Sequence, residues 1–464
     1  MPVCCAPGRI ALLVFAAAVV PRLAVLFAGP WADPERAIFD DSRRHLVLAE
    51  NLKHYGSFGL ADEEPARAWY GVFELRKANG TLPAPDAHGL YPEAFRTPGY
   101  PLFILATSAA AGGDVRAALF VQCVFGAFAA VCLYRLGLTL GLGRRAAVAA
   151  GLLWALHPGL VDRDCQFMTE SLFNSFGVFG LSAAAYGPRG WKGWVLAGAC
   201  LGFAGLVRPL AALYLPAAGY YAWRRADRRV LAAAVVAAVT LLPSVGWAAR
   251  NAAVGNGFRV TTVGDMTFFY HFAGYTLSEE RGADWQKTWP ERAEEQLAAL
   301  RPRVKPGADV FAEMRALATE ELKARPAVAA KVLAKSWVKL YATHSLGEMY
   351  RLLGLEYRPT NLMSRYVLGE AAPDEPAPPP ADAVLPLAWV GLNLAIAGLA
   401  LAGTVVGLRR RRFAFVLPLA ATVVLFTVAT MSQGMERFRS PFMFALFLLA
   451  VAPWGLTRHE PARG

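Results

Sequence analysis

Residues 12–28 read LLVFAAAVVPRLAVLFA, an apolar run that only Pro21 and Arg22 interrupt. A transmembrane helix needs about 20 mostly apolar residues, so this run predicts a membrane-spanning helix. No small-residue cleavage site with a polar flank follows the run. We therefore expect a retained membrane anchor rather than a removable signal peptide.

Further apolar runs recur along the chain, at residues 115–140, 146–160, 167–186, 191–207, 210–223, 230–249, 383–407, 413–431 and 438–456. By the same length criterion they predict about ten transmembrane helices in total. Hydrophobic residues make up 56% of the 464 residues, which agrees with this interpretation. The predicted fold is an all-α polytopic membrane protein.

Positive charge identifies the loops expected in the cytoplasm. Short loops with paired basic residues alternate with other loops, at Arg144-Arg145, Arg189 with Lys192, Arg224-Arg225 with Arg228-Arg229, and Arg409 to Arg412. Cytoplasmic loops of membrane proteins carry an excess of Lys and Arg, so both termini are predicted to be cytoplasmic. This bias also explains the net charge of +12, and we expect membrane lipids rather than nucleic acid as partners.

The remaining loops are then external, and two of them are long. They divide the chain into three predicted parts: a transmembrane catalytic module at 1–250 with the external loop 29–114, an external loop domain at 251–382, and C-terminal transmembrane helices at 383–464.

Both long loops contain helical patterns. Residues 42–55 place their apolar side chains on one face, which predicts an amphipathic helix on the membrane surface. Residues 100–111 are apolar but too few for a full span, and we expect an interfacial helix there. Residues 308–324 and 326–341 are also predicted to be helical.

Asp40 and Asp41 precede the amphipathic helix and are the first candidate catalytic residues. A carboxylate held at the membrane surface is able to accept a proton from an acceptor hydroxyl, as a general base. The alternative is an N-cap, a position that aspartate favours and that the helix dipole stabilises.

Basic residues at the outer helix ends are candidates for binding a phosphate. Arg96 precedes Thr97-Pro98-Gly99 and offers a bidentate guanidinium. Further arginines lie at predicted outer helix ends, at Arg208, Arg250, Arg437 and Arg439. Each alone is also explained as an anchor for lipid headgroups, but several together on the side where positive charge is not expected favour a phosphate site.

The turn between two predicted spans carries Asp162, Asp164 and Glu170. These acids are candidates for binding a sugar or a cation, whereas a solvated loop or dipole complementarity at a helix start would equally place acids there. His271 lies among aromatic residues and is more often structural than catalytic in such a setting. Carboxylates at Asp41, Asp164 and Glu170 suit a divalent cation without requiring one.

Several of these segments together resemble the GT-C fold glycosyltransferases, in particular glycosyltransferase family 39 and the protein O-mannosyltransferase-like group, which includes the aminoarabinose transferases of lipid A. The segments that carry the resemblance are Asp41-Ser42 with residues 48–52, residues 96–103, residues 158–173, residues 206–209, Trp247 with Arg250-Asn251, and residues 436–441. They cover the first 250 residues well and the last 80 loosely.

The resemblance implies roles for individual residues. The early catalytic aspartate of the family falls on Asp41, with Asp40 as the neighbouring alternative, and the acidic residue of the next external loop falls on Glu170. Donor-phosphate contacts fall on Arg96, Arg250 and Arg437. The chain departs from the family pattern at His45, where an aromatic residue is common, and in the order Arg96-Thr97-Pro98-Gly99.

The predicted function is transfer of a sugar from a polyprenyl-phosphate carrier to an acceptor hydroxyl, which belongs to a glycan, a glycolipid or a protein. We expect the enzyme in the bacterial inner membrane, with its active site on the periplasmic side. No Walker A loop, dinucleotide fingerprint or H-E-x-x-H motif occurs in the sequence. The alternatives are a transporter or flippase of a lipid-linked substrate and a non-catalytic assembly factor of the cell envelope.

Overall fold

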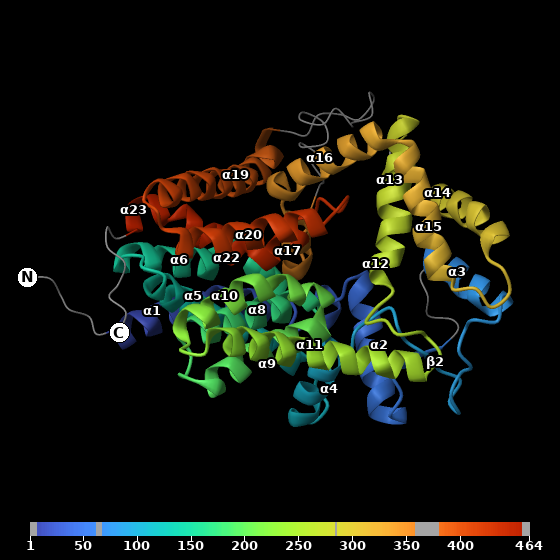
Figure 1. Cartoon of the computed structure of the whole chain (residues 1–464), viewed down its shortest axis with the longest axis horizontal. Coiled ribbons are helices and arrows are strands. Elements are labelled where there is room, and N and C mark those ends of the chain that lie inside the picture. Colours follow the sequence, from blue (N-terminus) through green and yellow to red (C-terminus); the bar gives the residue numbers. More distant parts are fainter. Residues whose placement is uncertain (1–6, 62–66, 284, 358–379, 457–464) are drawn as a thin grey trace, which may run out of the picture.

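The structure is a computed structural model that describes residues 7–61, 67–283, 285–357 and 380–456. Within these ranges nearly all regular structure is helical (Figure 1). The strands are β1 (Gly59–Leu60) and β2 (Tyr91–Pro92), which pair antiparallel with Leu60 opposite Tyr91. The predicted all-α membrane fold is confirmed.

Five segments among the described residues are long and apolar enough to cross a membrane. They are α1 (Pro7–Ala28), α5 (Arg116–Thr139), α11 (Arg229–Ala253), α19 (Pro380–Arg409) and the segment Glu436–Gly455, which comprises α21 (Glu436–Arg439), η5 (Ser440–Phe442), α22 (Met443–Ala450) and α23 (Ala452–Gly455). Helices lie at the other predicted runs too, but most are shorter. The predicted count of about ten spans is therefore not confirmed.

The shorter helices of the bundle are α6 (Arg144–Leu156), α7 (Pro158–Asp164), α8 (Thr169–Tyr186), α9 (Trp191–Val207), η2 (Pro209–Tyr214), α10 (Leu215–Arg225) and α20 (Phe413–Ala429). The 13 residues of α6 rise about 20 Å, whereas the hydrocarbon core of a bilayer is about 30 Å thick. Length separates most of these helices from the five long segments, whereas the 18 residues of α8 would suffice in length but include polar residues such as Glu170 and Asn174.

Glycines let α8, α9 and α11 approach one another closely. A Cβ atom at Gly180 would lie 2.5 Å from Leu201 Cγ, and one at Gly198 would lie 2.6 Å from Val239 Cβ. Small residues at helix contacts are typical of membrane bundles, where close van der Waals packing replaces the hydrophobic effect as the main attraction between helices. The bundle is therefore built on the small residues that its apolar runs contain.

The first long loop forms η1 (Pro34–Ala37), α2 (Asp40–Tyr55), α3 (Arg67–Ala78) and α4 (Gly99–Ala110). Helices α2 and α4 lie where amphipathic and interfacial helices were predicted. The 12 residues of α4 rise about 18 Å, which is too little to span a bilayer. Helix α2 packs against α4, and its residues Ser42, His45 and Leu48 are buried.

The second long loop forms α12 (Val263–Met266), the π-helix η3 (Thr267–Ala273), α13 (Gly274–Glu280), α14 (Trp285–Leu300), η4 (Arg301–Arg303), α15 (Val310–Ala324), α16 (Pro326–Ala342) and α17 (Leu346–Leu353). The helices predicted at 308–324 and 326–341 are confirmed as α15 and α16.

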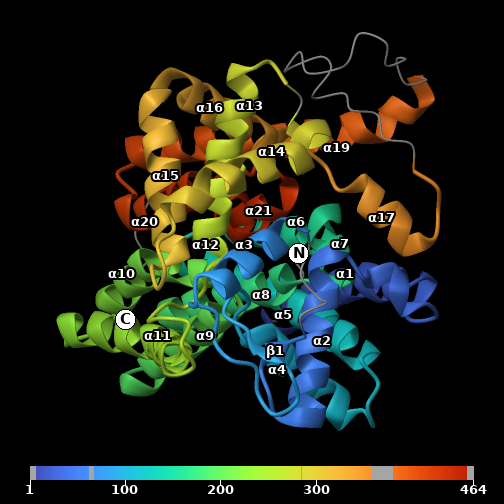
Figure 2. The same cartoon turned by 90° about the vertical axis from the view of Figure 1, so that its right-hand side faces the viewer.

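The two long loops share one hydrophobic core. Val72 of α3 packs with Phe269 of η3, Leu297 of α14 and Met314 of α15. We call α3 with α12–α15 the loop subdomain. It lies at one end of the long axis, beyond the bundle helices (Figures 1 and 2). A residue placed between the bundle and the loop subdomain is therefore enclosed by segments from both long loops.

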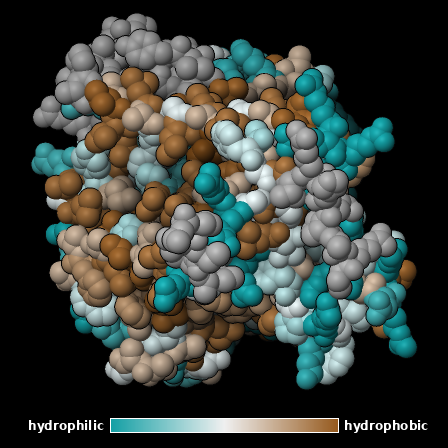
Figure 3. Space-filling view, turned by 90° about the vertical axis from the view of Figure 1, so that its left-hand side faces the viewer, coloured by the Kyte–Doolittle hydropathy of each residue, from teal (hydrophilic) through white to brown (hydrophobic). Residues whose placement is uncertain are grey.

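The outer surfaces of the long helices are apolar. Exposed large hydrophobic side chains include Leu12 and Leu13 on α1, Val230 and Leu242 on α11, and Leu401 on α19. Seen from the end away from the loop subdomain, hydrophobic areas alternate with hydrophilic side chains (Figure 3). Contiguous exposed apolar surface on helices of spanning length is the pattern expected of helices that face lipid.

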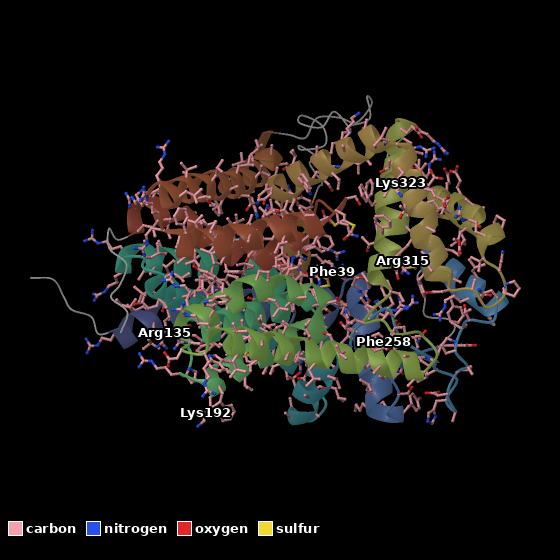
Figure 4. The ribbon with its side chains drawn as sticks, viewed as in Figure 1. Phe39, Arg135, Lys192, Phe258, Arg315 and Lys323 are labelled. Atoms are coloured by element: carbon pink, nitrogen blue, oxygen red, sulfur yellow. The ribbon has the colours of Figure 1, made fainter. Side chains whose placement is uncertain are left out.

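The two ends of the molecule carry different loops. Lys192, from a loop predicted to be cytoplasmic, lies toward one end of the long axis, whereas Arg315 and Lys323 of α15 lie toward the other (Figure 4). The bundle helices run between these ends (Figure 1). The arrangement agrees with short basic loops on one side and the two long loops on the other.

Candidate active site

Helix α2 presents Asp41 in its first turn. Phe39 is the N-cap residue, and its backbone N–H donates to Ser42 Oγ at 3.0 Å. The interpretation of Asp41 as an N-cap is therefore wrong: it is the second residue of the helix, and its carboxylate points to other segments. The side chain of Asp40, the alternative base, lies outside the described residues.

Two arginines from distant parts of the chain bind the two carboxylate oxygens of Asp41. Oδ1 accepts a hydrogen bond from Arg96 Nη2, and Oδ2 accepts one from Arg437 Nη1 at 3.1 Å. Burial raises the pKa of Asp41, but the guanidiniums of Arg96 and Arg437 outweigh it and hold the pKa well below its usual range. The structure thus brings together three of the predicted site residues.

The segment Arg96-Thr97-Pro98-Gly99 fits against the end of α9. Thr97 Oγ1 donates to the carbonyl oxygen of Val207 at 2.9 Å. A Cβ atom at Gly99 would lie 2.6 Å from the carbonyl carbon of Leu206, so this close approach requires glycine. Two of the sequence segments that carry the family resemblance therefore dock on each other, and the contact places Arg96 next to Arg208.

Glu93 holds the Arg96 backbone from the other side. Its Oε1 accepts hydrogen bonds from the backbone N–H groups of Phe95 and Arg96, the latter at 3.1 Å. The guanidinium of Arg96 lies over the Phe95 ring, 4.6 Å from its centroid. Glu93 is a positioning residue that sequence analysis did not single out, since nothing in its local pattern marks it.

A second ion pair adjoins the first. Glu170 begins α8 with a fully buried side chain, and its Oε1 lies 3.1 Å from Arg208 Nη1. Arg208 interacts electrostatically with Arg437, Asp41 and Arg96 as well as with Glu170. Sequence analysis named Arg208 only among the outer arginines, and the structure places it inside the cluster.

These five side chains form what we call the Asp41 cluster: Asp41, Arg96, Glu170, Arg208 and Arg437. Three guanidiniums against two carboxylates leave a net charge of +1. The Nε atoms of Arg96 and Arg437 are buried and have no hydrogen-bond partner. The cluster therefore has both spare positive charge and spare donors for an anionic ligand.

Two histidines border the cluster. His45 packs edge-on against Tyr100, and burial with the nearby Arg96 holds the pKa of His45 well below its usual range. His271 stacks on Trp289 with ring centroids 5.4 Å apart. Burial and then Arg437 lower the pKa of His271 to about 4, so both imidazoles are neutral near pH 7.

Asp164, predicted to bind substrate, is engaged elsewhere. Its Oδ2 accepts from Arg22 Nε at 2.7 Å, and its Oδ1 accepts from Ser171 Oγ at 2.6 Å. Arg22 also donates to the carbonyl oxygens of Ala18 and Ala155. The predicted turn contains the buried helix α7, and this pair joins α1 to the end of α7.

Arg250 and Arg439 are likewise held by the protein. Arg250 donates to the carbonyl oxygens of Glu93 at 2.9 Å and Phe58 at 3.0 Å, which braces the first loop. Arg439 donates to the carbonyl oxygen of Leu340 at 2.8 Å and pairs with Glu436 at 2.9 Å. The structure does not bring either guanidinium to Asp41.

The acidic residues do not form a set of metal ligands. Among the described residues, no group of three or more His, Cys, Asp or Glu side chains is arranged to hold a metal ion. Asp41 and Glu170 each face arginine, a donor set that suits an anion rather than a cation. We derive no step through a divalent cation.

Comparison with known proteins bears on this site. The sequence model of the family described as dolichyl-phosphate-mannose-protein mannosyltransferase matches residues 95–247. This third of the chain contains Arg96, Glu170 and Arg208 but neither Asp41 nor Arg437. The resemblance predicted from the sequence is confirmed over these residues. A search of curated proteins finds no match.

Solved structures with a similar arrangement are oligosaccharyltransferases of Archaeoglobus fulgidus. AglB in complex with an inhibitory peptide and a dolichol-phosphate is 15% identical with a TM-score of 0.48, and the match covers 95% of this chain and 50% of that chain. The apo form of the Archaeoglobus fulgidus enzyme is 15% identical with a TM-score of 0.43, over 95% of this chain and 50% of that chain. The chain thus spans about half the length of the structures it matches.

Proposed function

We propose that this protein is an inverting glycosyltransferase that moves a sugar from a polyprenyl-phosphate-sugar donor to an acceptor hydroxyl at the outer face of a bacterial inner membrane. The family match over residues 95–247 supports glycosyl transfer. The observation that carries the finer proposal is the Asp41 cluster. In it, Asp41 pairs with two arginines from distant segments, and the ion pair of Glu170 with Arg208 lies beside them.

The cluster suits the donor because of its charge. A polyprenyl-phosphate-sugar is a phosphodiester with one negative charge, which the net charge of +1 balances. Its phosphate oxygens compete with Asp41 for the guanidiniums of Arg96 and Arg437. Donor binding thereby releases the carboxylate oxygens of Asp41, which become available to the acceptor.

Transfer then follows in one displacement. Asp41 accepts the proton of the acceptor hydroxyl as its oxygen attacks the anomeric carbon from the face opposite the phosphate. The bond between the anomeric carbon and the phosphate oxygen breaks, and its electron pair stays on that oxygen. Polyprenyl phosphate gains a second negative charge, which Arg96, Arg208 and Arg437 stabilise as it develops. Attack from the opposite face inverts the anomeric configuration.

The position of the site supports its assignment to the outer face. Phe39, which precedes α2, lies near the middle of the molecule, where the bundle meets the segments formed by the long loops (Figure 4). Arg437 stands at the start of the spanning segment Glu436–Gly455, so a lipid phosphate at the membrane boundary reaches it. The loop subdomain limits the access of water, which reduces hydrolysis of the donor.

The test is release of polyprenyl phosphate by the purified protein in nanodiscs, with a panel of polyprenyl-phosphate sugars and candidate acceptors. We expect Asp41→Asn to abolish release from the donor that the wild type uses. Asp33→Asn is the matched control, because Asp33 lies in the same loop and forms an exposed ion pair with Arg36. Asp40→Asn tests the neighbouring alternative. Full transfer by both the Asp41 and the Asp40 variants would overturn the proposal.

A further inference from the structure

A pocket of about 100 Å³ lies between the first loop and the loop subdomain. Arg44 of α2, Arg76 of α3, Glu93 and Phe95 line it together with Phe311 of α15. Sites for whole small-molecule ligands begin at roughly 300 Å³, so this pocket fits one group of a larger molecule. It plays no part in the chemistry assigned above.

The pocket adjoins the Asp41 cluster through one aromatic ring. The guanidiniums of Arg96 and Arg44 both lie over the Phe95 ring, 4.6 Å and 5.1 Å from its centroid. Arg96 binds Asp41, whereas Arg44 lines the pocket. Arg44 also follows Asp41 by three residues on α2, which is about 4.5 Å along the helix axis. A molecule held in the pocket therefore reaches the proposed base with its neighbouring group.

Aromatic side chains form part of the pocket wall. Phe73 and Tyr91 are partly exposed and meet edge to face, with centroids 5.0 Å apart and ring planes at 87°. The face of an aromatic ring is electron-rich, and the C–H groups on one face of a sugar ring are electron-poor, so the two attract each other. Such a wall suits the edge of a saccharide.

Arg76 lies on the same face of α3 as Phe73. Among the described residues its guanidinium forms no ion pair, although Glu93 and Asp309 act on its charge from farther away. Arg76 Nη2 donates to two neutral acceptors, the carbonyl oxygen of Thr81 at 2.8 Å and Asn256 Oδ1 at 3.0 Å. Its guanidinium lies 5.2 Å above the Phe311 ring. Burial and the neighbouring Arg259 lower the pKa of Arg76 to about 10, which reflects a desolvated positive charge.

The second arginine of the pocket is only partly satisfied. Arg44 Nε lies 3.2 Å from Glu93 Oε2, but the two atoms are not aligned for a hydrogen bond, and this buried N–H has no hydrogen-bond partner. Among the described residues that line the pocket, Arg44 and Arg76 against Glu93 leave a net charge of +1. An excess of partly buried positive charge favours an anion, and a guanidinium fork matches a carboxylate or a phosphate.

We propose that this pocket binds an anionic sugar of the acceptor, a ring that carries a carboxylate or a phosphate, and thereby selects acidic glycans. The proposal rests on the proposed function, because it assigns the acceptor side of the same site. The charged group binds at Arg76 and Arg44, and the ring lies on Phe73 and Tyr91. The adjoining residue of the glycan then offers its hydroxyl to Asp41.

Binding is measured without turnover, by isothermal titration of the full-length protein in nanodiscs. The probes are a disaccharide that contains glucuronic acid, its carboxyl-reduced neutral counterpart, and a phosphorylated disaccharide. We expect at least one acidic probe to bind roughly tenfold or more tightly than the neutral one, as loss of a charge-assisted contact implies. The two acidic probes distinguish carboxylate from phosphate.

Variants then test whether Arg76 causes the preference for acidic probes. Arg76→Gln is expected to bind acidic and neutral probes alike, whereas Arg76→Lys keeps the charge and part of the preference. Arg301→Gln is the control, because Arg301 forms an exposed ion pair with Glu294 in the same subdomain. Equal binding of all probes by the wild type, or an unchanged preference in a folded Arg76→Gln protein, overturns the proposal.

Failure of this proposal is distinguishable from failure of the proposed function. If polyprenyl phosphate release depends on Asp41 but no acidic preference exists, only the acceptor pocket is wrong. If release does not depend on Asp41 or Asp40, the transferase mechanism is wrong, whatever the pocket binds.

Discussion

Replacing Arg437 by glutamine separates a phosphate-binding role from a purely structural one. Arg437 Nη1 donates to Asp41 Oδ2 at 3.1 Å, and its charge also acts on Glu170 and Arg208. Glutamine keeps a polar side chain but removes the charge. The Asp41 cluster then holds two guanidiniums and two carboxylates, so its net charge falls from +1 to zero.

The expected loss of kcat in Arg437→Gln follows from the charge that develops on the leaving phosphate. The leaving polyprenyl phosphate gains a negative charge in the transition state, and Arg437 is one of three cations available to stabilise it. Removing one such group from a preorganised site typically lowers kcat by about 100- to 1,000-fold, or about 3–4 kcal/mol of activation free energy. Arg437→Lys keeps the charge without the planar fork, and we expect it to lie between wild type and Arg437→Gln.

The same variant changes the pH profile. Arg437 helps to depress the pKa of Asp41, so its removal raises that pKa toward the ordinary aspartate value. A base must be ionised to act, and the acid limb of kcat/KM therefore moves to higher pH in the variant. The depressed pKa of Asp41 also contributes to the free energy of unfolding. That contribution is present above the unfolded-state pKa and is lost as the pH falls through the folded-state pKa.

The assay is release of polyprenyl phosphate over a range of donor concentrations, so that both kcat and kcat/KM are obtained, measured across acidic pH for wild type, Arg437→Gln and Arg437→Lys. Unfolding of each variant is followed in parallel, so that loss of fold is not mistaken for loss of stabilisation. A kcat for Arg437→Gln within about threefold of wild type, together with an unmoved acid limb, refutes the role assigned to Arg437.

Three further predictions test the surroundings of the site. Arg22→Met leaves Asp164 buried without its cation and is expected to lower the free energy of unfolding by about 3–5 kcal/mol. The double variant with Asp164→Asn is expected to recover part of that loss. Denaturation in detergent measures both variants. Gly99→Ala places a methyl group against the end of α9 and is expected to lower kcat by displacing Arg96, with donor binding as the second readout. Glu170→Gln leaves Arg208 unpaired, so product inhibition by polyprenyl phosphate is expected to strengthen; unchanged inhibition contradicts the assigned charge balance.

Sequence patterns located the helices well because apolar length is a local property. The runs at 115–140 and 191–207 correspond to α5 and α9, and residues 308–324 to α15. The number of spans is a different matter. An apolar run of 13–17 residues forms a helix whether it crosses the bilayer or ends within it. The sequence of such a run therefore does not decide between the two.

The site was predictable in part. Asp41 was named as the base and Arg96 and Arg437 as phosphate contacts, although 396 positions separate Asp41 from Arg437. Their pairing as one carboxylate between two guanidiniums depends on how α21 docks against α2, which no local pattern encodes. The pocket beside them was not predictable, since its walls come from both long loops.

Asp164 shows that residues close in sequence need not face the same site. It precedes Glu170 by six residues, and both were expected to face one ligand. Helix α7 turns Asp164 inward, where Gly126 leaves room: a Cβ atom there would lie 2.0 Å from Asp164 Oδ2. The partner, Arg22, appeared in the sequence only as an interruption of an apolar run. A charge inside such a run indicates a buried partner elsewhere in the chain.

The two charge groups differ in a way that separates structure from function: the Arg22–Asp164 pair is buried, whereas the Asp41 cluster is partly exposed except at Glu170. Arg22 and Asp164 form a one-to-one pair, and Arg22 directs its remaining donors to the carbonyl oxygens of Ala18 and Ala155. The Asp41 cluster instead holds more cations than anions and leaves the buried Nε atoms of Arg96 and Arg437 without partners. A protein gains no stability from uncompensated buried charge, because desolvation of each extra cation is costly. Binding of an anion offsets that cost, so the proposed function predicts that the cluster is more stable with a phosphate bound than without one.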